Sequence, residues 1–166
     1  MKSRLIAATT LLLVGGTEMA LVETQSATGS NPFAGAWLIT ETTTTDDAGT
    51  NVNKNPEPGV YIFTERHFSD MLIPGGERVP LGSEWTDAKR LKAYDNFVAD
   101  SGTYEYTEST VTARNIIAKI PDVMPPHTSG PLTYRWRLDD EDLVLTLTGG
   151  WAPPNGEVTY RLSRLE

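Results

Sequence analysis

Three runs of strict alternation between apolar and polar residues constrain this fold more than any other feature of the sequence. They span residues 132–138, 143–148 and 158–162, and turn-forming segments rich in Asp, Gly and Pro separate them. Successive side chains of a β-strand point to opposite faces, so each run predicts a strand with one buried and one solvated face. Strands that follow one another this closely pair with their neighbours, which predicts an antiparallel meander.

Upstream, the sequence has the same organisation with one change of period. Residues 85–98 place apolar side chains at spacings of three and four, which predicts an amphipathic helix capped by Ser83 or Thr86. Asp, Asn, Gly and Pro mark loops at 46–58 and 121–130. The β-branched and aromatic residues elsewhere favour strands, at residues 37–45, 60–64, 67–73, 103–107 and 110–120.

About eight strands and one helix in this order predict an all-β fold, an antiparallel up-and-down barrel with one inserted amphipathic helix. Closure of such a meander removes its exposed edges. A barrel of about eight strands has an interior that side chains fill or that holds one small ligand. We assign this domain to residues 30–166.

Residues 1–29 have a different composition, typical of a signal peptide followed by a flexible leader. Lys2 and Arg4 precede an apolar run at 5–14, which is shorter than the roughly 20 residues of a membrane span. An N-terminal core helix is the alternative, but the run has neither an amphipathic period nor a cap. We expect export, a mature N-terminus between Gly16 and Gly29, and no membrane anchor.

Charge and residue types argue against several classes of function. The formal net charge of −8 disfavours nucleic acids and favours a soluble monomer. The chain has no cysteine, which excludes disulfides, thiol nucleophiles and Cys-ligated metals. His67 and His127 have no neighbouring His ligands, and the acidic run 139–142 lacks the spacing of a calcium loop. We therefore expect no metal and no cofactor.

Four segments together resemble the bacterial and fungal lipocalin-like domain proteins, which are relatives of the calycins. They are the Gly-x-Trp opening at 33–39, the hairpin at 59–69, the helix-to-strand passage at 94–104 and the hairpin at 134–145. The resemblance covers nearly all of the chain after the leader. It implies a barrel with an internal pocket, whose ligand is unknown for most of the family. Relatives often carry His where this chain has Ala113, which argues against shared catalysis.

The ligand-binding candidates are aromatic side chains in the predicted strands and one arginine. Tyr and Trp combine an apolar ring with a polar tip, which suits a pocket that needs a few hydrogen bonds, although each would also suit a filled core. Arg114 shares a predicted face with apolar residues, where a ligand carboxylate, an acid of the barrel or exposure to solvent would satisfy its charge. The candidates are Tyr104, Tyr106, Arg114, Tyr134, Trp136 and Tyr160.

The leading hypothesis is an exported binding protein that sequesters or carries a small apolar or amphipathic molecule in its barrel. The alternative is an isomerase or cyclase that acts on a small apolar substrate in the same pocket, with tyrosines and an arginine polarising oxygens and no catalytic residue assigned. A barrel with a filled interior is the third interpretation. Either ligand hypothesis predicts a continuous cavity of about a few hundred Å³.

The resemblance also implies a structural contact at one end of the barrel, between the Trp of the opening strand and an Arg of the last strand. Trp37 matches the Trp, and Arg161 and Arg164 compete for the Arg. By strand alternation Arg164 continues the inward face of Tyr160 and Leu162, whereas Arg161 falls on the outer face. We predict that Arg164 lies across the Trp37 ring and that Arg161→Ala changes stability little.

Overall fold

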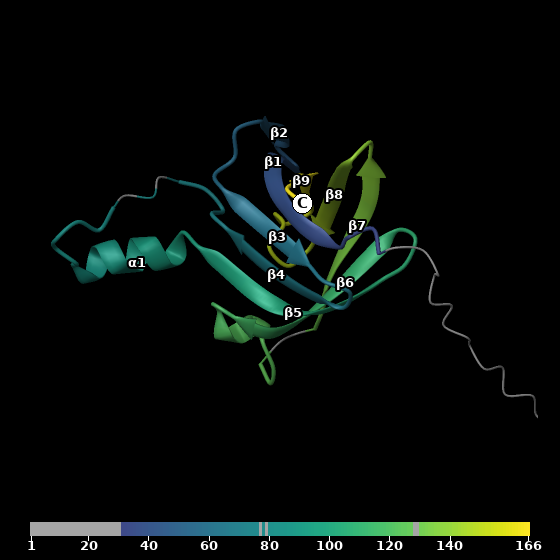
Figure 1. The fold of residues 1–166 in the computed structure, drawn as a ribbon. Coiled ribbons are helices and arrows are strands. Elements are labelled where there is room, and N and C mark those ends of the chain that lie inside the picture. Colours follow the sequence, from purple (N-terminus) through teal and green to yellow (C-terminus); the bar gives the residue numbers. More distant parts are fainter. Residues whose placement is uncertain (1–30, 77, 79, 128–129) are drawn as a thin grey trace, which may run out of the picture. The chain divides into compact units, whose positions relative to one another are not determined.

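The strands of the chain follow the predicted meander and coil around one interior (Figure 1). The computed structural model describes residues 31–76, 78, 80–127 and 130–166, so the predicted signal peptide lies outside the described residues. The strands are β1 (Gly35–Asp46), β2 (Gly49–Asn53), β3 (Gly59–Phe63), β4 (His67–Leu72), β5 (Val98–Tyr106), β6 (Thr110–Ala118), β7 (Leu132–Asp139), β8 (Asp142–Thr148) and β9 (Glu157–Arg164). Between them lie the helix α1 (Asp87–Asp95) and the 3-10 turn η1 (Pro121–Val123).

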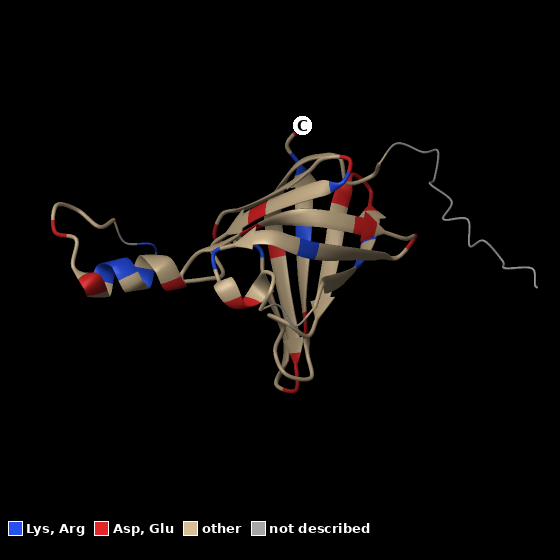
Figure 2. Cartoon of the chain, turned by 90° about the horizontal axis from the view of Figure 1, so that it is seen from below, with Lys and Arg blue, Asp and Glu red and all other residues tan. Residues whose placement is uncertain are grey.

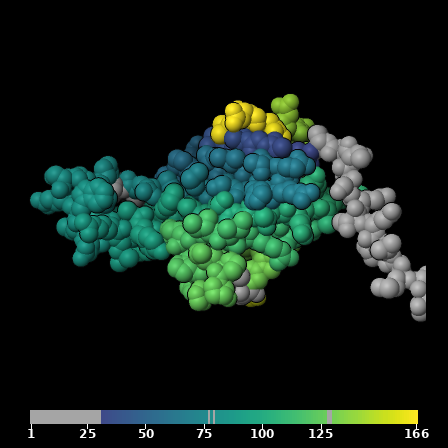
Figure 3. Space-filling model, turned by 60° about the horizontal axis from the view of Figure 1, so that its bottom comes forward, coloured from purple at the N-terminus to yellow at the C-terminus, as the bar shows by residue number. Residues whose placement is uncertain are grey.

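The sheet closes because β1 pairs with β9 as well as with its neighbours in sequence. The strand order is β2-β1-β3-β4-β5-β6-β7-β8-β9, and every pairing is antiparallel. The first residues of β1 pair with β3 and its last residues pair with β2, so β1 and β3–β9 form a closed eight-stranded barrel. Figure 3 shows the C-terminal segment against the N-terminal strand. The predicted fold class is confirmed.

The barrel interior is apolar where alternation requires it. Leu143, Leu145 and Leu147 of β8 and Leu162 of β9 are at most 2% exposed. Leu138, which the same alternation places inward, is 47% exposed because it lies at the end of β7 next to the turn into β8. The pattern therefore predicts the inward face along the middle of the strands and fails at their ends.

β2 and β5 differ from the sequence prediction. β2 lies inside the segment that the sequence predicts as a loop, where Thr50 pairs with Thr45 of β1. β5 begins at Val98, which the helical period includes. Because β5 starts there, the helix is shorter than the predicted 85–98.

The helix α1 also differs from prediction in its packing. Its cap is Thr86, as expected, and the Thr86 hydroxyl accepts a hydrogen bond from the Lys89 backbone N–H. No residue of α1 is buried, and Leu91 is 60% exposed, so its apolar face does not join the core. Figure 2 shows Lys and Arg gathered on this helix. No helix among the described residues is long and apolar enough to cross a membrane.

Candidate functional site

One end of the barrel is sealed by the predicted contact between the first and last strands. Trp37 of β1 pairs with Arg164 of β9 in the sheet register. The guanidinium carbon of Arg164 lies 4.1 Å from the centre of the Trp37 ring, and Trp37 is fully buried. Arg164 Nη1 also donates to the Ala34 carbonyl oxygen over 2.6 Å. The prediction is confirmed, and Arg161 lies on the outer face as expected, where it pairs with Asp139 and Asp142.

The close approach of the last strand at this end explains the glycine of the Gly-x-Trp opening. Gly35 has a φ of +133°, and a Cβ built there would lie 2.6 Å from Arg164 Nη1 and 2.5 Å from the Glu166 carbonyl oxygen. Residues with a side chain rarely adopt that backbone conformation. Glycine therefore lets the last strand approach closely enough for its arginine to cover the Trp37 ring.

Phe33 fills the interior next to this contact and separates the sealed end from the rest of the barrel. It is fully buried, and its ring centre lies 4.8 to 5.6 Å from four other ring centres, in tilted and edge-on arrangements. Aromatic pairs prefer such arrangements and each adds about 0.5–1.5 kcal/mol beyond burial. The four partners are Phe63, Tyr104, Tyr106 and Trp136.

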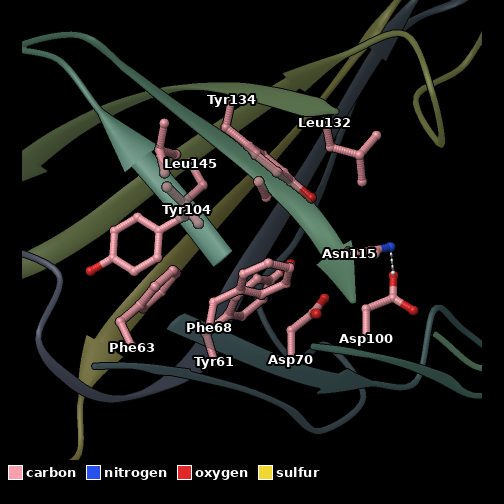
Figure 4. Close-up of a pocket in the computed structure, with 12 residues that line it drawn as sticks. Tyr61, Phe63, Phe68, Asp70, Asp100, Tyr104, Asn115, Leu132, Tyr134 and Leu145 are labelled. Carbon is pink, nitrogen blue, oxygen red and sulfur yellow. Dashed lines mark hydrogen bonds between the residues drawn. The ribbon is translucent and has the colours of Figure 1, made fainter. Parts of the chain in front are cut away.

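A pocket lies beyond this aromatic cluster, between strands on both sides of the barrel interior (Figure 4). Its enclosed volume is about 20 Å³, and the free space is about 390 Å³ when the open mouth is included. The lining is mostly aromatic and aliphatic, with two carboxylates and one amide. The lining residues are Tyr61, Phe63, Phe68, Asp70, Asp100, Tyr104, Val111, Ala113, Asn115, Leu132, Tyr134 and Leu145.

The two carboxylates of the pocket stand on neighbouring strands. Asp70 of β4 pairs directly with Asp100 of β5, and the two residues are 6% and 8% exposed. The Asp100 Oδ2 accepts a hydrogen bond from Asn115 Nδ2 over 3.4 Å. Asp70 Oδ1 is buried and has no hydrogen-bond partner among the described residues. Figure 4 shows the Asp70 carboxyl pointing into the pocket.

Burial sets the protonation of these acids. Desolvation, with a further contribution from the negative charge of Asp100, raises the pKa of Asp70 to about 7. Desolvation also raises the pKa of Asp100, while hydrogen bonds from the Asn115 side chain and the Lys119 backbone oppose that increase. No group of three or more His, Cys, Asp or Glu side chains in the described part of the chain is arranged to hold a metal ion. The site is therefore a carboxyl pair in which Asp70 changes charge near neutral pH.

Three tyrosines lie around Asp70, on strands β3, β7 and β9. Desolvation raises the pKa of Tyr61, Tyr134 and Tyr160, and the charge of Asp70 adds to each of these increases. The tyrosines are therefore neutral over the physiological range and add no charge to the surroundings of Asp70.

The structure separates the six predicted site residues into four groups. Tyr104 and Tyr134 line the pocket, although the Tyr104 hydroxyl already donates to the Thr64 carbonyl oxygen over 2.7 Å. Tyr160 packs partly buried against the core, with its ring centre 6.3 Å from that of Tyr61. Tyr106, Trp136 and Arg114 lie outside the pocket lining.

Tyr106 and Trp136 belong to the aromatic cluster around Phe33 and do not line the pocket. The Trp136 indole N–H donates to the Thr107 carbonyl oxygen over 2.9 Å, so its polar tip is occupied. The placement of Arg114 in the pocket is wrong. Strand alternation turns its neighbours Ala113 and Asn115 inward and leaves Arg114 exposed on the outer face.

The cavity is far smaller than either ligand hypothesis requires. An enclosed volume of about 20 Å³ holds roughly one water molecule, whereas pockets that enclose a whole drug-sized molecule measure about 300–1,000 Å³. The cavity of about a few hundred Å³ that either ligand hypothesis predicts is not found among the described residues, because aromatic rings from β3, β4, β5 and β7 fill the interior. The barrel therefore does not enclose a whole small molecule, and its interior is close to the filled core of the third interpretation.

Comparisons with known proteins add a distant structural likeness. No protein-family model and no curated protein matches the sequence. A lipocalin-like protein from Bacteroides uniformis is similar over 79% of this chain and 98% of its own, with 14% identity and a TM-score of 0.43. An uncharacterised protein from Bacteroides eggerthii is similar over 78% and 98%, with 12% identity and a TM-score of 0.42.

The chain folds as a closed antiparallel barrel of eight strands with one inserted helix. The strand order and the β1–β9 closure carry this assignment. They match the architecture that the four sequence segments imply.

Proposed function

We propose that the protein binds a small amphipathic molecule, with the polar end inside the barrel and the apolar body in the pocket mouth. The unpartnered Oδ1 of Asp70 carries this proposal. A buried polar atom without a partner costs about 1–3 kcal/mol, and native proteins leave very few of them. A hydrogen-bond donor supplied by a ligand would remove that cost.

The dimensions of the pocket support entry by one end of a molecule. The cavity volume of about 20 Å³ suits a single polar group, so the rest of a bound molecule would lie outside the filled core. Leu132 and Asn115 line the pocket and are half-buried. An apolar body would be in contact with such partly exposed residues and would leave the filled core undisturbed.

Titration of the full chain with benzyl alcohol, followed by backbone amide chemical shifts, tests this proposal. We expect shifts confined to the pocket strands, at residues such as Ala113 and Leu145. Ala113→Leu should fill the pocket and weaken binding at least about tenfold, because one added side chain occupies the small enclosed space. Thr133→Leu, on an exposed outer position of β7, is the matched control. If no amide shifts change, binding in the pocket is refuted. It is also refuted if the shift changes are scattered over the surface and Ala113→Leu does not reduce them.

We also propose that the protein is exported before it binds its ligand. The support is the basic start and short apolar run of residues 1–14. N-terminal sequencing of the protein from its natural host should give a start between Gly16 and Gly29. Recovery of the chain with Met1 intact in the cytoplasm would contradict export.

One observation favours a second function, acid–base isomerisation or cyclisation of a bound molecule. The pKa of Asp70 at about 7 suits proton transfer near neutral pH, and such transfer by a positioned side chain contributes about 10²–10⁴-fold. Native mass spectrometry of protein from its host should reveal a retained molecule. Incubation of that molecule in D2O distinguishes the functions: deuterium uptake at carbon that requires Asp70 indicates catalysis, and its absence indicates binding alone.

A further inference from the structure

All charged side chains that line the pocket are acidic. Asp70 and Asp100 are the ionisable acids of the lining, and none of the described lining residues is Lys, Arg or His. Two like charges on directly opposed strand positions repel each other and destabilise the sheet. A ligand anion would add to this repulsion, so the pocket disfavours carboxylates and phosphates.

The two acids are not equivalent. Asp100 is supported by the amide of Asn115 and by the positive charge of Lys119. Asp70 has no cation beside it, and its Oδ1 is buried without a hydrogen-bond partner in the described structure. The missing partner of Asp70 is therefore a hydrogen-bond donor, and a cationic donor would also neutralise the charge of the pair.

We propose that the pocket selects molecules whose polar end is a protonated amine, held between Asp70 and Asp100. The inference rests on the proposed function and names the ligand class of the same site. A primary ammonium is about the size of the enclosed cavity and has three N–H donors for the two carboxylates. The rings of Tyr61 and Phe68, which also line the pocket, offer aromatic surface that attracts a cation.

Amine binding at this site depends on pH through Asp70. The groups that face it are Tyr61 of β3, Asp100 of β5, Tyr134 of β7 and Tyr160 of β9, and the tyrosines are neutral. Protonation of Asp70 at low pH removes the charge that the ammonium needs. The amine affinity should therefore fall as pH drops through about 7, approaching about tenfold per pH unit below that point.

Three isosteric probes test the inference on the full chain: benzylamine, benzyl alcohol and benzoate, titrated at pH 8 with backbone amide shifts as the readout. We expect benzylamine to bind at least about tenfold more tightly than benzyl alcohol, since hydrogen bonds to charged groups are the stronger ones. We expect no binding of benzoate. Asp70→Asn should weaken benzylamine binding far more than benzyl alcohol binding, and should remove the pH dependence of benzylamine binding. Glu105→Gln, on the exposed face of β5, is the matched control and should change neither.

The outcomes separate this inference from the proposed function. If no probe shifts the pocket residues, both fail. If benzyl alcohol binds as tightly as benzylamine, or if Asp70→Asn leaves the preference intact, the pocket binds small molecules but amine selection is wrong. If the wild-type protein binds benzylamine more tightly than benzyl alcohol at pH 8, and loses this preference as the pH falls below about 7, as the pKa of Asp70 requires, the inference stands.

Discussion

The sealed end and the pocket end of the barrel differ in whether their buried polar groups have hydrogen-bond partners. At the sealed end the Trp37 indole N–H donates to the Phe33 carbonyl oxygen over 2.8 Å, and Arg164 donates to two backbone carbonyls. At the pocket end a buried oxygen of Asp70 has no partner in the described structure. The difference indicates that contacts at the sealed end stabilise the barrel, while the pocket end contains a buried polar atom whose lack of a partner among the described residues is unfavourable.

Among these substitutions, Phe33→Ala should cause the largest loss in the free energy of unfolding. The side chain is fully buried among four aromatic rings, and such truncations cost about 3–5 kcal/mol. Urea unfolding measures the loss, and Phe33→Leu should lose less because it leaves a smaller cavity. A loss below about 1 kcal/mol would show that Phe33 does not close the barrel.

Asp70→Asn should stabilise the protein, and only at neutral and higher pH. The pKa of Asp70 is about 7 in the folded chain against 3.8 normally, so the folded state favours the protonated acid. The wild type therefore loses stability as pH rises from about 4 to 7. Near pH 4 the free energy of unfolding of the variant should equal that of the wild type. At pH 8 the variant should be more stable than the wild type, by at most on the order of 4 kcal/mol. Unfolding curves at both pH values check this. A variant that is less stable at pH 8 would show that the Asp70 charge is satisfied in the folded protein.

Arg164→Ala should lower stability by about 0.5–2 kcal/mol, the range of a cation over an indole, and leave probe affinity unchanged. Arg161→Ala is the informative comparison. Arg161 pairs with two partly exposed carboxylates on the outer face, and pairs that solvent reaches contribute about 0–1 kcal/mol. Thermal unfolding of the two variants side by side measures the order. If Arg161→Ala lowers thermal stability more than Arg164→Ala does, the expected order is wrong.

Arg114→Ala should have the smallest effect of the series. The side chain is exposed on the outer face of β6, and substitutions at such positions change stability by less than about 0.5 kcal/mol. Affinity for all three probes should equal that of the wild type. A loss of benzoate or benzyl alcohol binding would return Arg114 to the list of pocket residues.

The sequence predicts the barrel well because its fold depends on local signals. Alternation in β7, β8 and β9 identifies the inward face, and parity along β9 is enough to choose Arg164 over Arg161 as the partner of Trp37. The recurrence of Leu91 and its neighbours with a helical period predicts the amphipathic helix. That period does not show whether another element lies close enough to cover the apolar face, and no residue of α1 is buried in the described part of the chain.

The acidic pair of the pocket is the part that the sequence analysis missed. Asp70 stands between Phe68 and Leu72 at a spacing of two, on a face that is otherwise apolar, and this was a usable signal. Asp100 gives none, because it lies between the predicted helix at 85–98 and the predicted strand at 103–107, outside both elements. The strand register that sets the two acids opposite each other is a long-range property, which no local pattern contains.

The pairing of β1 with β9 also determines when the barrel loses its edges. Every other pairing joins strands that are close along the chain, whereas this one joins Trp37 to Arg164. Loop-closure entropy grows with separation, so the seam costs more to form than any single hairpin. Until it forms, β1 and β9 each present a free strand edge, and free edges recruit other chains. Damage to the eight residues of β9 would therefore expose this protein to aggregation even with its pocket strands intact.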